Sequence, residues 1–456
     1  MKWNTLKKSI YILGLLLLIT NTINAQEIEP ELKQLIRKGI HKELSVNTYQ
    51  IETDKARIDQ KLAKSVFIPK ITLNGSFTRL DDDIKFDEQT NNLLLATQKL
   101  LIKEAIGIPF NTPLPSTVPV KEIPSLQDKN ILKSSVDVDW VLFSGLKVTN
   151  AIKAAKHKEK SLTFLEKAEK DKTALKIIEN YDKLALINAS ESVLKATEKY
   201  LNEQYLFVSK AIKNGLATPI DRRKIELAQQ QLISKQMEYK RNKELVLNVL
   251  QQETGESLEK LRLLNPKLDL ILPNESKTTK RNEIKALEEA EKATLYKAKM
   301  EKSNFIPKVA LKGHYEILDD DLSIFDPKWY VGVGVKWNVL DGFESKLKSK
   351  KILLDRLKYQ KKKENAKEMI QLSIVKANLD FKLANQKIKI AKKEISLSEA
   401  TYKMVKKQYK NGLASISDVL DAVKDLEKAN FDLKQAYFNQ RRTAFNVLHA
   451  NGNLNY

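Results

Sequence analysis

Four short segments of the chain alternate apolar and polar residues. The first two are residues 71–78 and 135–142, and the other two are residues 309–317 and 331–339. A period of two is the pattern of β-strands, in which successive side chains point to opposite faces. The sequence therefore predicts four strands per chain, each with one apolar face and one polar face.

The polar faces of these strands carry charges, and the strand ends carry aromatic rings. This pattern is compatible with the half-buried sheet of a soluble protein and with a membrane barrel that has lipid outside and water inside. Aromatic rings prefer the interface of a bilayer, which favours the barrel. The candidate pore-lining residues are Asp137, Asp139, Lys312, His314, Glu316 and Lys336, and the candidate interface aromatics are Phe67, Trp140, Phe305, Trp329 and Trp337.

Two long segments lack glycine and proline and carry a helical pattern instead. Each lies between two glycines that are 70 residues apart, Gly145 to Gly215 and Gly342 to Gly412. A helix of about 60 residues would be ~90 Å long. In the second segment, apolar residues recur in steps of four and three up to Tyr409, as in a coiled-coil seam. With return helices predicted for residues 218–253 and 415–450, the chain forms two long helical hairpins.

Strands and hairpin occur twice in the same order because the chain is internally duplicated. Phe67-Ile-Pro-Lys returns at Phe305 after 238 residues, and Lys213-Asn-Gly-Leu-Ala returns at Lys410 after 197 residues. The two offsets differ by 41 residues, so the first copy has about 41 additional residues between its two strands. Repeats of this length indicate duplicated halves related by pseudo-symmetry rather than a solenoid.

The duplication predicts two repeats separated by a linker. The first repeat covers residues 26–264, with an insertion at 84–133 and a hairpin tip near 214–221. A linker at 265–280 follows. The second repeat covers residues 281–456 and has its hairpin tip near 411–421. Within the insertion, Leu93 to Ile106 is amphipathic and predicts a short helix, and the prolines that follow favour extended backbone. We interpret the insertion as a lid or a surface shield.

Residues 1–25 have the layout of a secretory signal peptide. Lysines precede an apolar run from Ile10 to Ile19, and the small residue Ala25 follows. The run is too short to span a bilayer as a helix, and no other long apolar stretch exists, which excludes a helical inner-membrane protein. The absence of cysteine excludes disulfides, thiolate metal sites and a lipid-modified cysteine. We expect an exported protein.

Composition argues against several other functions. The net charge of +22 arises from lysines that share their helices with many glutamates, and no nucleic-acid reader motif is present, so we expect no nucleic-acid partner. No nucleophile elbow, phosphate loop or zinc pair occurs, so we expect no enzyme, no metal and no cofactor. The aspartate triplets at 81–83 and 319–321 are interpreted as solvated turns, with a calcium site as the alternative.

Four strands cannot close a barrel. About eight strands are the minimum, and barrels of that size are filled by side chains, whereas larger ones hold water. Three chains would supply about twelve strands and a lumen for the charged residues. The predicted fold class is therefore an α+β membrane protein in which a homotrimer forms a 12-stranded β-barrel, continued by a long α-helical coiled-coil barrel.

The chain resembles the TolC family of outer-membrane efflux and secretion ducts. The resemblance rests on the paired strand starts at Phe67 and Phe305, on the paired tips 214–221 and 411–418, and on Val419-Leu-Asp-Ala422. It implies a channel in outer-membrane lipid that extends into the periplasm and joins a periplasmic adaptor (membrane fusion protein) and an inner-membrane pump. The protein would be the passive exit duct of a tripartite efflux pump or a type I secretion system.

The resemblance also implies a periplasmic gate at the hairpin tips. Asp418 and Asp421 match the family's acidic ring, and Asp221 and Tyr409 match positions that lock the tips. The sequence departs from the family pattern at Ala414, where an arginine is expected. For Asp221 and Asp418, helix capping is the alternative interpretation.

A periplasmic coiled-coil adaptor or scaffold is the rival function from another class. Such a protein would need one helical hairpin flanked by compact β-domains. The sequence instead has two hairpins, each preceded by two amphipathic strands. Substrate and pump class cannot be inferred from the residues of a passive duct.

Overall fold

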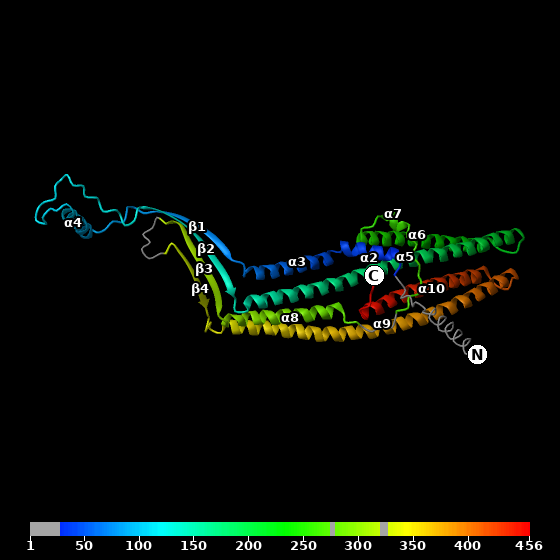
Figure 1. The fold of residues 1–456 in the computed structure, drawn as a ribbon. Helices are drawn as coiled ribbons and strands as arrows, with labels where there is room; N and C mark the ends of the chain where they lie inside the picture. The colour runs from blue at the N-terminus through cyan, green and yellow to red at the C-terminus, as the bar shows by residue number, and fades with distance from the viewer. Residues whose placement is uncertain (1–27, 274–278, 320–326) are drawn as a thin grey trace, which may run out of the picture. The chain divides into compact units, whose positions relative to one another are not determined.

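The computed structural model describes residues 28–273, 279–319 and 327–456, and the predicted signal peptide lies outside them (Figure 1). The chain divides into two compact units. The helical unit comprises the chain up to Lys55, His157–Glu291 and Leu357–Tyr456, and the sheet unit comprises Ala56–Lys156 and Lys292–Arg356. Each unit therefore draws on both halves of the sequence.

Helices make up most of the chain. They are α2 (Pro30–Lys42), α3 (Leu44–Ser65), α5 (Lys147–Lys213), α6 (Pro219–Thr254), α7 (Leu258–Arg262), α8 (Asn282–Lys302), α9 (Glu344–Lys410) and α10 (Ile416–Ala450). Helices α5 and α9 both have 67 residues, as expected for segments without glycine or proline. No helix in the described ranges is both long and apolar enough to cross a bilayer.

Two apolar clusters hold the helical unit together. One joins five helices through Ile36 of α2, Ile177 of α5, Leu250 of α6, Leu261 of α7 and Phe445 of α10. Burying each such side chain stabilises the fold by roughly 1.5–3 kcal/mol. The other cluster lies toward the hairpin tips and joins both hairpins: Leu201 and Val208 of α5, Ile225 of α6, Tyr402 of α9 and Val419 of α10.

A polar network ties the linker to the second hairpin. The side-chain amide of Gln440 donates to the carbonyl of Ile271 at 2.7 Å and accepts from its N–H at 3.2 Å. The neighbouring Arg441 donates to the carboxylate of Asp182 at 2.9 Å and to the carbonyl of Asp269 at 3.0 Å. These bonds satisfy backbone groups of a linker segment that has no secondary structure of its own.

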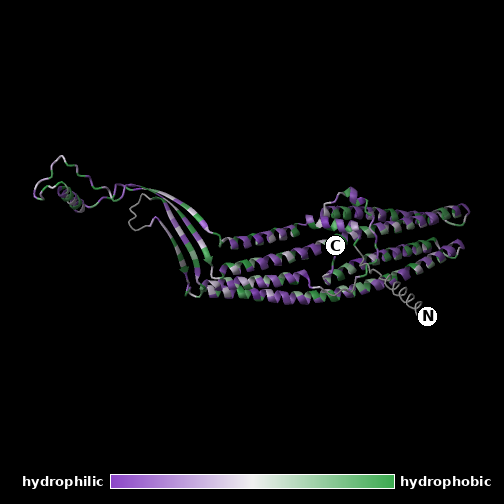
Figure 2. Cartoon of the chain, in the orientation of Figure 1, coloured by the Kyte–Doolittle hydropathy of each residue, from purple (hydrophilic) through white to green (hydrophobic). Residues whose placement is uncertain are grey.

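The sheet unit contains four antiparallel strands in the order β1-β2-β3-β4. They are β1 (Lys70–Arg79), β2 (Asn130–Phe143), β3 (Lys308–Asp319) and β4 (Trp329–Lys336). The alternation of hydrophobic and hydrophilic residues along these strands is visible in Figure 2. The α+β fold class with four strands per chain is confirmed.

Two predicted boundaries differ from the structure. Residues 130–133, expected in the insertion, belong to β2, where Asn130 pairs with Arg79, because Leu132 continues the apolar row. Residues 337–339, expected in the fourth strand, lie beyond its end at Lys336. The alternation of apolar and polar residues continues through 337–339, but these residues do not pair as a strand. Trp337 instead donates its indole N–H to the carbonyl of Phe305 at 3.0 Å.

The segment between β1 and β2 contains the predicted helix. Helix α4 (Glu88–Ala105) begins at Asp87, whose carboxylate accepts the N–H of Thr90 at 2.8 Å. No residue of α4 is buried. At the base of the segment, Ile84 forms an antiparallel bridge with Gln127.

The strand-to-helix turns of the two repeats share an uncommon backbone. Gly145 and Leu146 have φ values of 64° and 68°, and their counterparts Gly342 and Phe343 have 61° and 65°. A positive φ is uncommon for leucine and phenylalanine. The duplication therefore preserves a demanding backbone turn as well as the sequence motif.

Candidate functional site

Both hairpin tips end their outgoing helix in the same way. Gly215 has φ 72°, and the following Leu216 N–H reaches back to the carbonyl of Ala211 at 2.8 Å. At the second tip, Gly412 has φ 71°, and the N–H of Leu413 donates to the carbonyl of Gln408 at 2.9 Å. This bond pattern satisfies the last carbonyls of a helix and requires the left-handed backbone that glycine adopts readily. The repeated Asn-Gly-Leu-Ala motif thus specifies a sharp reversal.

Asp221 and Asp418 form capping boxes at the start of the return helices. Asp418 accepts from the N–H and hydroxyl of Ser415, both at 2.7 Å, and Asp221 accepts from Thr218 at 2.8 and 2.9 Å. The side chain and backbone of Ser415 hold the pKa of Asp418 below its usual value. The capping interpretation therefore accounts for both carboxylates.

Asp421 lies one turn further along α10, and its carboxylate is exposed. The corresponding position in the first repeat is Lys224, whose Nζ donates to the hydroxyl of Ser417 at 2.8 Å. The two repeats thus present opposite charges at equivalent positions. Lys224 also lowers the pKa of Asp418, so the first hairpin contributes to the electrostatics of the second.

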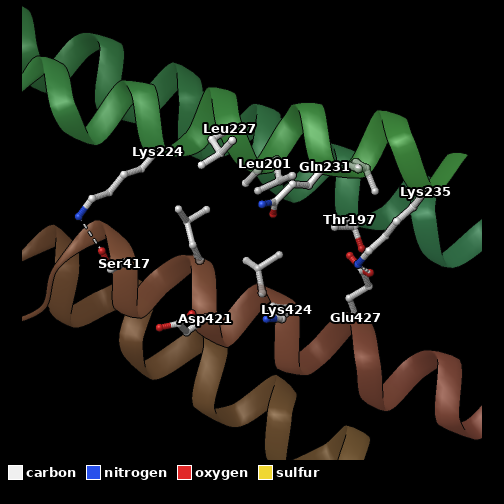
Figure 3. A pocket seen from close by; sticks show the side chains of 14 residues that line it. Thr197, Leu201, Lys224, Leu227, Gln231, Lys235, Ser417, Asp421, Lys424 and Glu427 are labelled. Atoms are coloured by element: carbon white, nitrogen blue, oxygen red, sulfur yellow. Dashed lines mark hydrogen bonds and ion pairs between the residues drawn. The ribbon is translucent and has the colours of Figure 1, made fainter.

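A cleft of about 550 Å³ lies between these return helices. Figure 3 shows Lys224 bonded to Ser417 at one end and Lys235 facing Glu427 at the other. The Nζ of Lys235 lies 2.5 Å from the carboxylate of Glu427. Asp421 is among the residues that line the space between these two bridges. The structure therefore brings Asp421 and Asp418 to the same end of α10 as a bridge between the two hairpins.

Tyr409 of α9 lies at the contact between the two outgoing helices, α5 and α9. Its ring meets Phe207 edge-on with centroids 5.8 Å apart, and one heptad earlier Tyr402 meets Tyr200 at 5.1 Å. Burial raises the pKa of Tyr409, and the charge of Asp221 adds to this effect. Tyr409 thus joins the second hairpin to the first through an aromatic contact.

The partners of Tyr409, Tyr402 and Glu427 were not predicted from the sequence. Tyr200 and Phe207 have the seven-residue spacing of Tyr402 and Tyr409, and this shared spacing was the available signal. The Lys235–Glu427 bridge had no such signal, because its two positions are not equivalent in the duplication.

The sheet brings the candidate pore-lining residues onto one face. Asp137 of β2 pairs with His314 of β3, and Asp139 pairs with Lys312. The imidazole Nδ1 of His314 lies 2.7 Å from Asp137, and its Nε2 lies 3.5 Å from Glu316. The same face carries Lys336, opposite Lys308, at one end of β4.

The other face of the sheet is apolar, and no described residue covers it. Ile71 and Leu73 are 73% and 70% exposed, and Val333 and Val335 are 65% and 67% exposed. A continuous apolar surface of this kind is unfavourable in water and marks a membrane or protein interface. One face is therefore suited to water and the other to an apolar surrounding.

The predicted interface aromatics lie at both ends of the strands. Trp140 donates its indole N–H to the carbonyl of Phe67 at 2.9 Å, and Trp337 and Phe305 make the equivalent bond in the second repeat. Trp329 begins β4 at the opposite end and is 64% exposed. The rings thus flank the apolar face on two sides.

The first aspartate triplet closes a loop. Asp83 accepts the N–H of Lys129 at 2.8 Å, and Asp81 and Asp82 accept from the next residue's N–H. In the second triplet, residues 320 and 321 lie outside the described residues. No cluster of potential metal ligands occurs in the described part of the chain.

Comparison with known proteins finds a family match in the second half of the chain. Residues 276–452 match the family model for outer membrane efflux proteins. A search of curated protein sequences finds no match.

Solved structures extend the likeness over nearly the whole chain. The fold is similar to VceC of Vibrio cholerae, with a TM-score of 0.69 and 15% identity over 92% of this chain and 96% of that one. It is similar to the CmeC outer membrane channel of Campylobacter jejuni, with a TM-score of 0.68 and 16% identity over 93% and 86% of the chains. It is also similar to the MtrE outer membrane channel of Neisseria gonorrhoeae, with a TM-score of 0.67 and 14% identity over 93% of this chain and 89% of that one.

Proposed function

We propose that the protein is an outer-membrane exit duct, because residues 276–452 match the family model for outer membrane efflux proteins and the first half completes the same fold. It conducts substrates passively from an inner-membrane pump and a periplasmic adaptor to the exterior. The pump is part of a tripartite efflux system or a type I secretion system.

The observation that carries the proposal is the two-faced sheet. Its apolar face is uncovered, and its polar face carries a hydrogen-bonded row from Asn74 through Asp137 to His314. Lipid covers the first face and water the second in a membrane barrel. A periplasmic adaptor or scaffold, the rival function, would leave the apolar face in water.

Closure of the barrel requires other copies of the chain. Strands β1 and β4 are the edges of the sheet, and unpaired edges are not tolerated in lipid. Three chains would pair β4 of one protomer with β1 of the next and give about twelve strands. In that trimer Asp137, Asp139, Lys312, His314, Glu316 and Lys336 line the water-filled lumen.

The hairpin tips form the periplasmic entrance in this proposal. Asp418 and Asp421 are charged and exposed there, and three copies around an axis would favour cations. In this proposal Tyr409, whose ring packs against Phe207 of the first hairpin, and Asp221 occupy the lock positions of the tips.

Membrane fractionation and single-channel recording test the proposal. We expect the mature protein in the outer-membrane fraction, resistant to carbonate and trimeric in mild detergent. Purified trimers should conduct ions in a planar bilayer. Extraction by carbonate alone, or a monomer without conductance, would contradict it.

A further inference from the structure

The sheet unit contains a cavity of about 690 Å³ on the polar face of the sheet, where the strands meet the helices. This volume is in the range of small-molecule sites. Its floor is the row of Val141, Ala310 and Gly334, which are paired across three strands. The small side chains in this row leave the space open.

Apart from Ser144 and the lysines, the remaining walls are apolar. Val66 follows α3, Val148 and Ala151 belong to the first turns of α5, and Met300 belongs to the last turn of α8. Val148 is 7% exposed, so the helical wall is well packed. An aliphatic chain would find mainly methyl groups here, with no polar side chain on the floor.

Four lysines surround these walls. Lys312 lies two residues from Ala310 on one side, and Lys308, paired with Lys336, lies two residues away on the other. The fourth, Lys147, donates to the side chain of Asn304 at 3.3 Å. Within the residues that the structure describes, Lys308, Lys312 and Lys336 make no ion pair with a carboxylate. The cavity therefore combines an apolar interior with a cluster of four lysines, of which Lys312 has Asp139 opposite it on the neighbouring strand.

We propose that this cavity binds anionic amphiphiles, molecules with one aliphatic chain and a carboxylate or similar head group. The chain would occupy the space above Ala310 and Gly334, and the lysines would hold the head group through charge-assisted hydrogen bonds. The proposal rests on the proposed function, in which the polar face lines the lumen. The occupant is therefore a molecule in transit through the duct.

Binding is measured on full-length trimers in phosphatidylcholine nanodiscs with the fluorescent fatty acid 11-(dansylamino)undecanoic acid. We expect saturable binding that dodecanoate displaces and that dodecyltrimethylammonium and dodecyl maltoside do not. Lys308→Gln combined with Lys336→Gln should weaken binding by about tenfold or more, because two charges are lost. Lys70→Gln is the control, because Lys70 lies on the same polar face outside the cavity.

A second variant tests the cavity without changing charge. A side chain at Gly334 would project into open space, since a Cβ there has only the carbonyl of Ala310 at 3.9 Å. Gly334→Leu should abolish probe binding by filling the cavity. Gly332→Leu is the matched control, because Gly332 also has free space but does not line the cavity.

Three results would overturn the proposal. The first is equal displacement of the probe by the cationic amphiphile, and the second is unchanged probe binding in Gly334→Leu trimers. The third is loss of probe binding when phosphatidylglycerol replaces phosphatidylcholine in the nanodiscs, because this result would assign the cavity to bilayer lipid. Conductance of the same trimers separates the two proposals. Conducting trimers that do not bind the probe contradict only the amphiphile site, and binding trimers that do not conduct contradict the duct and the transit of its occupant.

Discussion

Arg441 of α10 donates a hydrogen bond to Asp182 of α5 at 2.9 Å, and the two residues are 3% and 1% exposed. Burial raises the pKa of Asp182 to about 7, and the charge of Arg441 offsets only part of this effect. Glu29 lies 3.6 Å from the same guanidinium and adds a second negative charge. The contact between the two hairpins therefore depends on pH.

The sign of this dependence follows from the raised pKa. Between the ordinary pKa of 3.8 and about 7, the folded protein binds more protons at Asp182 than the unfolded chain does. The contribution of Asp182 to the free energy of unfolding thus grows as the pH falls from about 7 toward 4. Asp182→Asn should remove this contribution.

Thermal unfolding followed by circular dichroism at several pH values measures the effect. His449, whose pKa is lowered to about 4 by burial and by Arg281, acts in the opposite direction. The difference between parent and variant isolates Asp182, and the exposed Asp425→Asn serves as the control. Parallel pH profiles for parent and D182N would show that Asp182 does not titrate in this range.

Much of this fold was predictable because local patterns specified it. The period of two placed Asp137 and His314 on the same face, and the tip motifs marked where α5 and α9 end. The Arg441–Asp182 pair gave no such signal. Its two residues are 259 positions apart, and the duplication places Glu244 and Leu379 at the equivalent sites. Contacts that break the symmetry of a repeat cannot be inferred from the repeat.

The two tip aspartates should differ in what they contribute. Asp421 makes no cap, so Asp421→Asn should lower cation over anion selectivity and weaken block by divalent ions without loss of trimer. Asp418→Asn should also lower selectivity, but it should destabilise the tip by about 0.3–1 kcal/mol, because a negative charge is lost from the helix N-terminus and its hydrogen bonds with Ser415 are weakened. Single-channel recording and urea unfolding separate the two effects. Parent-like selectivity in the double variant would make both residues purely structural.

The equivalent glycines of the strand-to-helix turns provide a matched pair. Both have a positive φ, but a Cβ at Gly145 would lie 2.8 Å from the carbonyl oxygen of Ile306, whereas one at Gly342 meets nothing within 4 Å. Gly342→Ala should cost about 1–2 kcal/mol from backbone strain. Gly145→Ala should cost more, about 3 kcal/mol, because backbone must also shift. Equal unfolding midpoints in urea would contradict the role of the close contact.

The insertion should be dispensable for assembly. Its base is closed by Lys129, which bonds to Leu80 and Asp83, so these residues are retained and residues 88–125 are replaced by a short Gly-Ser turn. Trimer yield should be unchanged, since no residue of α4 is buried. A higher open-channel conductance would identify the insertion as a lid, and an unchanged conductance as a shield. Loss of trimers would show that it packs against the barrel.

The interleaving of the two halves in both compact units sets an order for biogenesis. Strand β2 of the first half pairs with β3 of the second, where Val136 lies opposite Tyr315, and Asp182 meets Arg441 only when the last helix is present. Neither unit can be completed while the C-terminal half is still being synthesised. Until then β2 lacks its partner β3, and the apolar faces of the first half stay uncovered, so this chain depends on protection from aggregation until the second half is available.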